Sequence, residues 1–206
     1  MNTRIPLLSL AAAMASLLLL SGCEDHDRGP RTTGTIVCIG DSLTAGIHCI
    51  GAPYPSRLRT LTGRPVVNMG VGGATSSDGV SAISRALARD PGVVCVLYGS
   101  NDPGNGIPVS RTVANIRKIV AACQAQGVPV VVGTPPPTIA PHVNRNDHHA
   151  DASRQIKELA KEKGVTVVDI NAAVGDDPQR YLNPEDGLHL SNEGGDLFAR
   201  LFREEL

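Results

Sequence analysis

A serine, a histidine and an aspartate in this sequence occur in contexts that suit nucleophilic catalysis. Ser42 lies in the run Gly-Asp-Ser-Leu-Thr that ends an apolar segment, and Asp186 precedes His189 by three residues. A serine hydroxyl is a weak nucleophile until a neighbouring base accepts its proton. Asp186 can reach one ring nitrogen of His189 across a single turn, which fixes the tautomer and leaves the other nitrogen free to face Ser42. The pattern therefore predicts a triad of these three residues.

Two further segments can supply the hydrogen-bond donors that stabilise an oxyanion when a serine attacks a carbonyl group. Gly73 lies in the run Asn-Met-Gly-Val-Gly-Gly-Ala-Thr and, having no Cβ, can present its backbone N–H at close range. Asn101 lies in the run Gly-Ser-Asn-Asp and offers an uncharged side-chain amide. Together with the backbone N–H of Ser42, these groups provide three donors for one oxygen.

The elements that must position these residues are indicated by five apolar runs rich in β-branched residues. Such continuous runs are expected for strands that are covered on both faces of a parallel sheet. Strands that alternate with helices predict a doubly wound, three-layer α/β domain, in which ligands bind beyond the carboxyl ends of the strands. The runs span residues 35–40, 65–70, 93–99, 128–134 and 165–170.

Between these runs, apolar residues recur at helical spacing and predict the covering helices. The last stretch begins after Ser191, a residue type that caps helices. The predicted buried stripes are Tyr54, Leu58 and Leu61; Val80, Ile83 and Leu87; Val113, Ile116, Val120 and Cys123; and Leu197, Phe198, Leu201 and Phe202. Ile156, Leu159 and Lys163 form a weaker set with the same spacing.

The four polar segments, in this order, resemble the sequence blocks of the GDSL esterase/lipase family, also called SGNH hydrolases. The resemblance extends from the first predicted strand to the last helix. It implies that Ser42 is the nucleophile, that Gly73 and Asn101 are oxyanion donors, and that His189 is the base with Asp186 as its partner. It also implies a flavodoxin-like sheet with the strand order 2-1-3-4-5.

Each segment has an ordinary structural explanation when it is taken alone. Gly-Asp-Ser is common where a strand turns into a helix, and there Asp41 is expected to cap the helix or brace the loop. The glycine run loosely resembles a dinucleotide-binding turn but lacks the Gly-x-Gly-x-x-Gly spacing. Asn101 can belong to a simple turn, and His189 can be a surface residue. The ordered set of four favours catalysis.

The predicted activity is hydrolysis of short-chain carboxylic esters, in a small molecule or a glycan, through an acyl-enzyme. This chemistry requires no metal and no organic cofactor. Two alternatives remain open at this stage: an acyl or acetyl transferase that uses the same site, and a catalytically silent envelope lipoprotein that binds a partner.

The pattern of the N-terminal segment predicts a targeting signal. Residues 1–22 contain one charge, at Arg4, followed by an uncharged stretch, and the run Leu-Ser-Gly-Cys that ends at Cys23 resembles a bacterial lipobox. We expect residues 1–22 to be a signal peptide, Cys23 to be lipidated, residues 23–33 to be a polar tether and residues 34–206 to be the hydrolase domain. The protein is then a monomer anchored to a membrane of the bacterial cell envelope.

Composition excludes some functions. The chain has 206 residues and a formal net charge of −1, which offers no basic surface for nucleic acid. Tryptophan is absent, so a large aromatic platform for stacking is not expected.

An oxidising compartment would permit disulfides, and the sequence does not choose among the pairings of Cys38, Cys49, Cys95 and Cys123. Cys38 and Cys95 lie in strand-like runs and read as small buried hydrophobic residues.

One histidine-rich segment also has metal-ligating residue types. It follows the fourth predicted strand and is rich in proline, which predicts a solvated loop at the substrate rim with no scaffold for a metal site. The residues concerned are His142, Asp147, His148, His149 and Asp151. His48 and Cys49, just beyond the Ser42 segment, are expected to pack or to line the rim.

Overall fold

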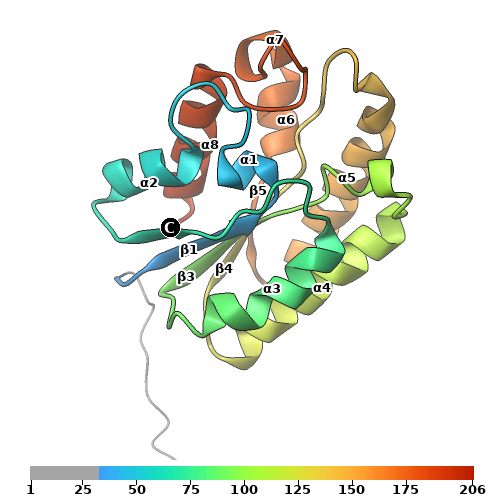
Figure 1. The fold of residues 1–206 in the computed structure, drawn as a ribbon. Coiled ribbons are helices and arrows are strands. Elements are labelled where there is room, and N and C mark those ends of the chain that lie inside the picture. Colours follow the sequence, from blue (N-terminus) through green and yellow to red (C-terminus); the bar gives the residue numbers. More distant parts are fainter. Residues whose placement is uncertain (1–32) are drawn as a thin grey trace, which may run out of the picture.

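A five-stranded sheet, in which every strand runs parallel to its neighbours, forms the centre of the computed structural model, which describes residues 33–206 (Figure 1). The strand order is β2-β1-β3-β4-β5. The predicted doubly wound α/β architecture and its strand order are both confirmed. The strands are β1 (Ile36–Gly40), β2 (Val66–Asn68), β3 (Val93–Leu97), β4 (Val130–Gly133) and β5 (Thr166–Val168).

The predicted signal peptide (1–22), the lipidation site Cys23 and nearly all of the predicted tether (23–33) lie outside the described residues. Within residues 33–206, no helix combines the length and the apolar character that crossing a membrane requires.

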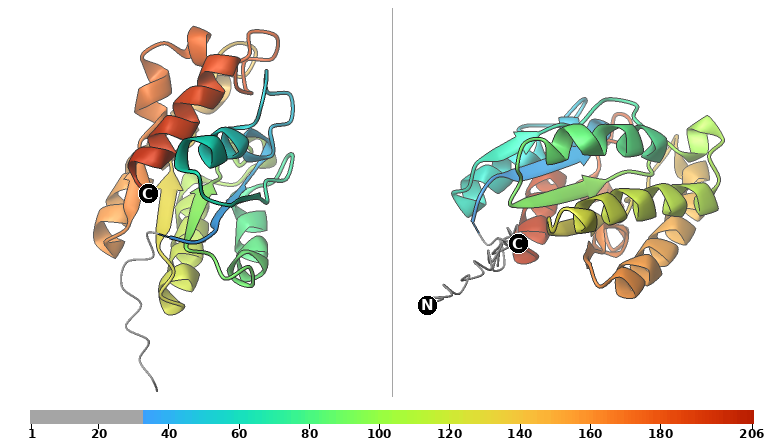
Figure 2. Two further views of the ribbon diagram at one scale, coloured as in Figure 1. Left: turned by 90° about the vertical axis from the view of Figure 1, so that its left-hand side faces the viewer. Right: turned by 90° about the horizontal axis from the view of Figure 1, so that it is seen from below.

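Helices cover both faces of the sheet, so the protein has three layers (Figures 1 and 2). The helices of the first face are α3 (Ser76–Leu87), α4 (Val109–Ala125) and α5 (Asn146–Lys163). The helices of the second face are α2 (Tyr54–Thr62), α6 (Ile170–Gly175) and α8 (Asn192–Glu204). Shorter elements are α1 (Ser42–Ala45), η1 (Pro103–Asn105), η2 (Val143–Arg145) and α7 (Pro178–Tyr181).

The central strands β1 and β3 are fully buried, whereas the edge strands β2 and β5 are partly exposed because each has a neighbour on one side only. Cys38 of β1 pairs in register with Cys95 of β3, and both side chains are buried. All four cysteines in the described residues are free. Cys38 and Cys95 therefore pack as small hydrophobic residues, as predicted.

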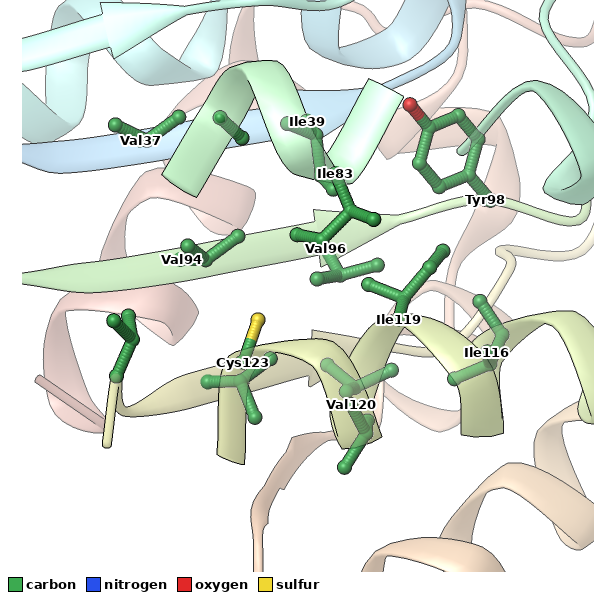
Figure 3. Packing of buried hydrophobic residues seen from close by; sticks show 14 of the residues in the cluster. Val37, Ile39, Ile83, Val94, Val96, Tyr98, Ile116, Ile119, Val120 and Cys123 are labelled. Carbon is green, nitrogen blue, oxygen red and sulfur yellow. The ribbon is translucent and has the colours of Figure 1, made fainter. Parts of the chain in front are cut away.

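Each face of the sheet has its own hydrophobic core. In the first, aliphatic side chains of β1 and β3 pack against α3 and α4, with Tyr98 at the end of the cluster (Figure 3). In the second, Tyr54 stacks on Phe202 with ring centroids 5.2 Å apart.

Leu61, predicted to be buried with Tyr54, is instead 43% exposed. It faces a groove between α2 and α8 whose other wall carries the polar residues Asp196 and Arg200.

The end of β2 is tied to the helix that begins at Ser42. The Asn68 side chain donates a hydrogen bond to Thr44 O and accepts one from Gly70 N. Gly70 approaches so closely that a Cβ on it would overlap the backbone nitrogen of Ala45. A residue without a side chain is therefore required at position 70.

We expect Gly70→Ala to lower the free energy of unfolding by about 1–3 kcal/mol, because the added methyl group must displace backbone atoms. Gly175→Ala is the matched control, since a Cβ there would meet nothing within 4 Å. The control variant should be neutral or stabilised by up to about 1 kcal/mol. Urea unfolding measures both, and equal losses in the two variants would contradict the prediction.

Candidate active site

The predicted nucleophile is presented by a sharp turn between β1 and α1. Asp41 is the N-cap of α1, and its Oδ1 accepts a hydrogen bond from Leu43 N at 2.9 Å. The capping role predicted for Asp41 is thus confirmed. Ser42 is the first residue of α1 and lies at the carboxyl end of a central strand. This is the edge of the sheet where ligands bind in parallel α/β folds.

The structure brings Ser42 and His189 together. Ser42 Oγ lies 3.0 Å from His189 Nε2, and His189 Nδ1 lies 2.9 Å from Asp186 Oδ2. The other carboxylate oxygen, Asp186 Oδ1, accepts hydrogen bonds from the backbone N–H groups of Leu188 and His189 at 2.8 and 2.9 Å. A continuous chain of polar contacts therefore runs from the serine to a carboxylate that its own turn holds in place.

The environment of Asp186 favours the ionised carboxylate. Its partial burial acts to raise the pKa, but the hydrogen bonds from the backbone N–H groups of His189 and Leu188, together with the His189 side chain, outweigh burial and lower the pKa below its ordinary value. An ionised Asp186 can hold Nδ1–H of the imidazole, so that Nε2 faces the serine as a proton acceptor.

Asn183 supports this turn and was not singled out in the sequence. Its Oδ1 accepts a hydrogen bond from Glu185 N, and its backbone O accepts one from Gly187 N. Its Nδ2 donates to His48 O at 3.1 Å. The side chain is buried, and an asparagine placed shortly before an Asp-Gly pair is a signal of a structured turn that could have identified it.

The predicted oxyanion donors have uncommitted hydrogens. Gly73 has the positive φ of +74°, and neither its N–H nor the N–H of Ser42 donates to another residue within 33–206. Asn101 Nδ2 donates one hydrogen to Ala74 O at 3.0 Å, a bond that joins the two donor segments. Its second N–H has no partner among the residues that the structure describes. The arrangement can therefore offer donors to a developing negative charge.

A buried polar network holds these two segments beneath the site. The carboxylate of Asp102 accepts hydrogen bonds from Ser76 N, Ser76 Oγ and Thr112 Oγ1 at 2.9, 2.6 and 2.6 Å. Asn115 Nδ2 donates to Ser76 Oγ at 2.9 Å. This network was not predicted from the sequence. Thr112 and Asn115 are polar residues on the buried face of α4, and polar residues within an apolar helical stripe could have indicated it.

His48 lies beside the predicted base, as the rim assignment anticipated. Its ring centroid is 5.2 Å from that of His189, and its backbone has a positive φ of 55°. The side chain is exposed, as is that of its neighbour Ile47, whereas Cys49 is partly buried. These residues form the edge of the site on the side of α1.

The expectation that the histidine-rich segment is a loop is wrong from Asn146 onward. Residues 146–151, which include Asp147, His148, His149 and Asp151, form the start of α5. The start of the helix was hidden because its buried face there uses polar and small residues, His149, Ala152 and Ser153, before the apolar Ile156 and Leu159. Across the described part of the chain, His, Cys, Asp and Glu side chains form no group of three or more that could hold a metal ion.

His149 braces the segment that carries Asn101. Its Nδ1 lies 2.7 Å from Pro136 O and its Nε2 lies 3.3 Å from Ser100 O, while Arg145 also donates to Ser100 O. Burial lowers the pKa of His149 to about 4, against the opposing effect of the two carbonyl groups. The neutral imidazole has one N–H, which can donate to only one of the two carbonyl oxygens, and its buried ring packs against the segment that carries Asn101.

The chain is similar to several known proteins in sequence. The sequence matches the GDSL-like Lipase/Acylhydrolase family over residues 38–197. It is 26% identical over 201 residues to an acetylxylan esterase of Xylanibacter ruminicola, covering 81% of this chain and 42% of that protein. It is 36% identical over 81 residues to a diglucosylglycerate octanoyltransferase of Mycolicibacterium hassiacum, covering 39% of this chain and 34% of that protein. The chain thus spans less than half the length of these curated relatives.

Solved structures show the same fold. A lipase/acylhydrolase from Enterococcus faecalis has a TM-score of 0.73 and 23% identity, covering 84% of this chain and 95% of that chain. A mutant of Axe2, an acetylxylan esterase from Geobacillus stearothermophilus, has a TM-score of 0.69 and 22% identity, covering 84% and 93% of the two chains.

Acid should destabilise the protein through His149. Because its pKa is about 4 when folded and about 6.5 when unfolded, the unfolded chain binds more protons between these values. The stability that neutral His149 provides is present above pH 6.5 and is lost as the pH falls. Between pH 7 and 4.5 this loss is about 2–3 kcal/mol.

Urea unfolding of the wild type and of His149→Gln at both pH values measures the effect. The variant should lack this part of the pH dependence. An unfolding free energy that falls equally in both proteins would show that His149 is not responsible.

Proposed function

Because the chain belongs to the GDSL-like lipase/acylhydrolase family, we propose that it is a serine esterase that cleaves carboxylic esters through an acyl-enzyme. One observation supports this above all: the chain of contacts of 3.0 and 2.9 Å that joins Ser42, His189 and Asp186. A serine within hydrogen-bond distance of an imidazole that a carboxylate orients is the arrangement that activates a hydroxyl nucleophile.

In this mechanism Ser42 Oγ bonds to the ester carbonyl carbon while its proton passes to His189 Nε2. The carbonyl electron pair moves onto oxygen, where the N–H groups of Ser42 and Gly73 and the amide of Asn101 stabilise it. The C–O bond to the alcohol then breaks, and His189 gives its proton to the leaving oxygen. Water repeats the cycle on the acyl-enzyme and releases the acid. The ionised Asp186 stabilises the imidazolium formed in each half.

The substrate we propose is a short-chain ester, with an acetyl group carried by a sugar as the first choice. The matched relative from Xylanibacter ruminicola is an acetylxylan esterase, which supports a small acyl group and a glycan alcohol. Ser42 also lies at the carboxyl edge of the sheet, where the exposed side chain of Ile47 follows α1. No metal or organic cofactor takes part in the proposed reaction.

Acyl transfer is the second candidate, favoured by the similarity of part of the chain to a sugar octanoyltransferase. The two activities share the acyl-enzyme and differ in whether water or a sugar hydroxyl attacks it. Product analysis in the presence of an added sugar alcohol distinguishes them, because transfer yields a new sugar ester while hydrolysis yields only the free acid.

We further propose that the protein works as a monomer at the bacterial cell envelope, held to a membrane by lipid on Cys23 after removal of residues 1–22. The Leu-Ser-Gly-Cys run supports this proposal. More than one acyl chain would hold the protein stably, where a single chain would not. Mass spectrometry of the mature N-terminus tests it.

The proposed function predicts covalent labelling of Ser42 by a fluorophosphonate. Ser42→Ala should abolish both labelling and hydrolysis, whereas Ser110→Ala, which alters an exposed serine of α4, should retain both. A chain-length series of p-nitrophenyl esters should show the highest kcat/KM for the acetyl ester. Absence of labelling and of hydrolysis in the wild type would instead favour a silent envelope-binding protein.

Asn101→Ala should lower kcat by about 10²- to 10³-fold with little change in KM, because the lost donor acts mainly on the transition state. Asn144→Ala, in an exposed residue of η2, is the control and should keep kcat. Steady-state kinetics on p-nitrophenyl acetate give the comparison. An unchanged kcat for Asn101→Ala would remove this residue from the oxyanion site.

A further inference from the structure

A hollow of about 340 Å³ lies between α3 and residues 71–74, the segment that contains the predicted oxyanion donor Gly73. The backbone of Gly72 and Gly73 forms one wall, and Ser81 and Arg85 of α3 form another. Tyr98, which follows β3, also lines it. Ser42 and His189 are not among its lining residues, so it is distinct from the site of bond cleavage.

Tyr98 supplies an unused donor in this hollow. The residue is 1% exposed, yet its hydroxyl makes no hydrogen bond with any residue of 33–206. Burial raises the pKa of Tyr98, so the hydroxyl keeps its proton. A Cβ on Gly79 would lie 2.7 Å from the Tyr98 ring, so a glycine at this turn of α3 makes room for it. The ring is packed in the core while the hydroxyl borders the hollow, so a ligand group there can accept its proton.

Arg85 supplies further donors. Its side chain is exposed and forms no ion pair or hydrogen bond with another described residue. Asp78 also faces the hollow, but its Oδ2 already accepts hydrogen bonds from Thr75 N and Thr75 Oγ1. The hollow therefore offers a phenolic hydroxyl, a guanidinium and the Ser81 hydroxyl next to the apolar side chains of Val71, Ala74 and Ala82.

The wall between this hollow and the oxyanion site is thin. Gly73 belongs to both, as an uncommitted N–H donor and as a lining residue. A Cβ at position 73 would meet no atom within 4 Å, so open space adjoins the glycine. An ester whose carbonyl oxygen is held by the Gly73 N–H can thus extend over one glycine and place its next group in the hollow.

We propose that this hollow is the sugar-binding subsite for the alcohol part of the substrate, a neutral sugar ring. This inference rests on the proposed esterase function. Hydroxyl groups of a sugar accept from Tyr98 and Arg85 and donate to Asp78, while its C–H face packs on Val71 and Ala82. A volume of about 340 Å³ is at the lower end of the range for small-molecule pockets and accommodates a unit of this size.

Kinetics with two substrates test the subsite. Tyr98→Phe and Arg85→Gln should each raise KM for acetylated xylotriose by roughly 3- to 10-fold, the effect of one lost hydrogen bond. Both should leave kcat/KM for p-nitrophenyl acetate, which has no sugar, within about twofold of the wild type. Arg89→Gln is the matched control, because Arg89 is also exposed but lies beyond α3 and outside the hollow. Equal effects of all three variants, or no effect of the first two, would overturn the proposal.

Calorimetric titration of Ser42→Ala with xylotriose and acetylated xylotriose separates the subsite from the esterase function. Binding that weakens when Tyr98→Phe or Arg85→Gln is added, but not when Arg89→Gln is added, supports the subsite even if the wild type cleaves no ester. Hydrolysis of p-nitrophenyl acetate without any binding of either sugar leaves the esterase function standing and refutes the subsite.

Discussion

The 3.0 Å separation between Ser42 Oγ and His189 Nε2 joins residues that are 147 positions apart, and the proposed chemistry depends on it. A parallel sheet places the loops after all its strands at one edge, which brings the two residues into the same region. A local contact then fixes the position of His189. The turn that carries His189 is fastened to the loop after β4 by the hydrogen bond from Ile139 N to Gly187 O, at 2.9 Å. Gly187 has a positive φ of 70°, and a Cβ there would overlap Ala140 O, so only glycine permits this contact.

Buried polar side chains support the site, although burial of a polar group costs free energy unless it is hydrogen-bonded. The Asp102 carboxylate is fully buried and tolerable there because three donors from α3 and α4 surround it. Removal of one partner would leave a buried polar group short of a hydrogen bond, so the network resists partial rearrangement. His149 supports the site from the other side, where its ring lies between the carbonyl oxygens of Pro136 and Ser100 and can donate its one N–H to either. Rigid support of this kind would keep the proposed oxyanion donors in position before any substrate binds.

Much of this arrangement could be read from residue types and their spacing. Continuous apolar runs located all five strands, because helices cover both faces of a parallel sheet and so favour apolar residues at successive positions of a strand. The capping by Asp41 and by Ser191 followed from side-chain chemistry that acts within three residues. Where prediction failed, burial depended on distant neighbours. Leu61 has helical spacing yet stays exposed in a groove between α2 and α8, and His149 is polar yet forms part of the buried face of α5.

From the sequence alone came the identity of the triad candidates, the α/β class and the edge of the sheet at which the site lies, because these depend on residue chemistry and on periodicity along the chain. Packing between elements settled the rest. Within residues 33–206 it decided which backbone N–H groups have no partner, that the four cysteines there are unpaired, and that a hollow bordered by a tyrosine hydroxyl without a partner adjoins Gly73. Such features arise from contacts among residues far apart in the chain. No local pattern encodes them, because each depends on atoms that only folding brings within a few ångströms.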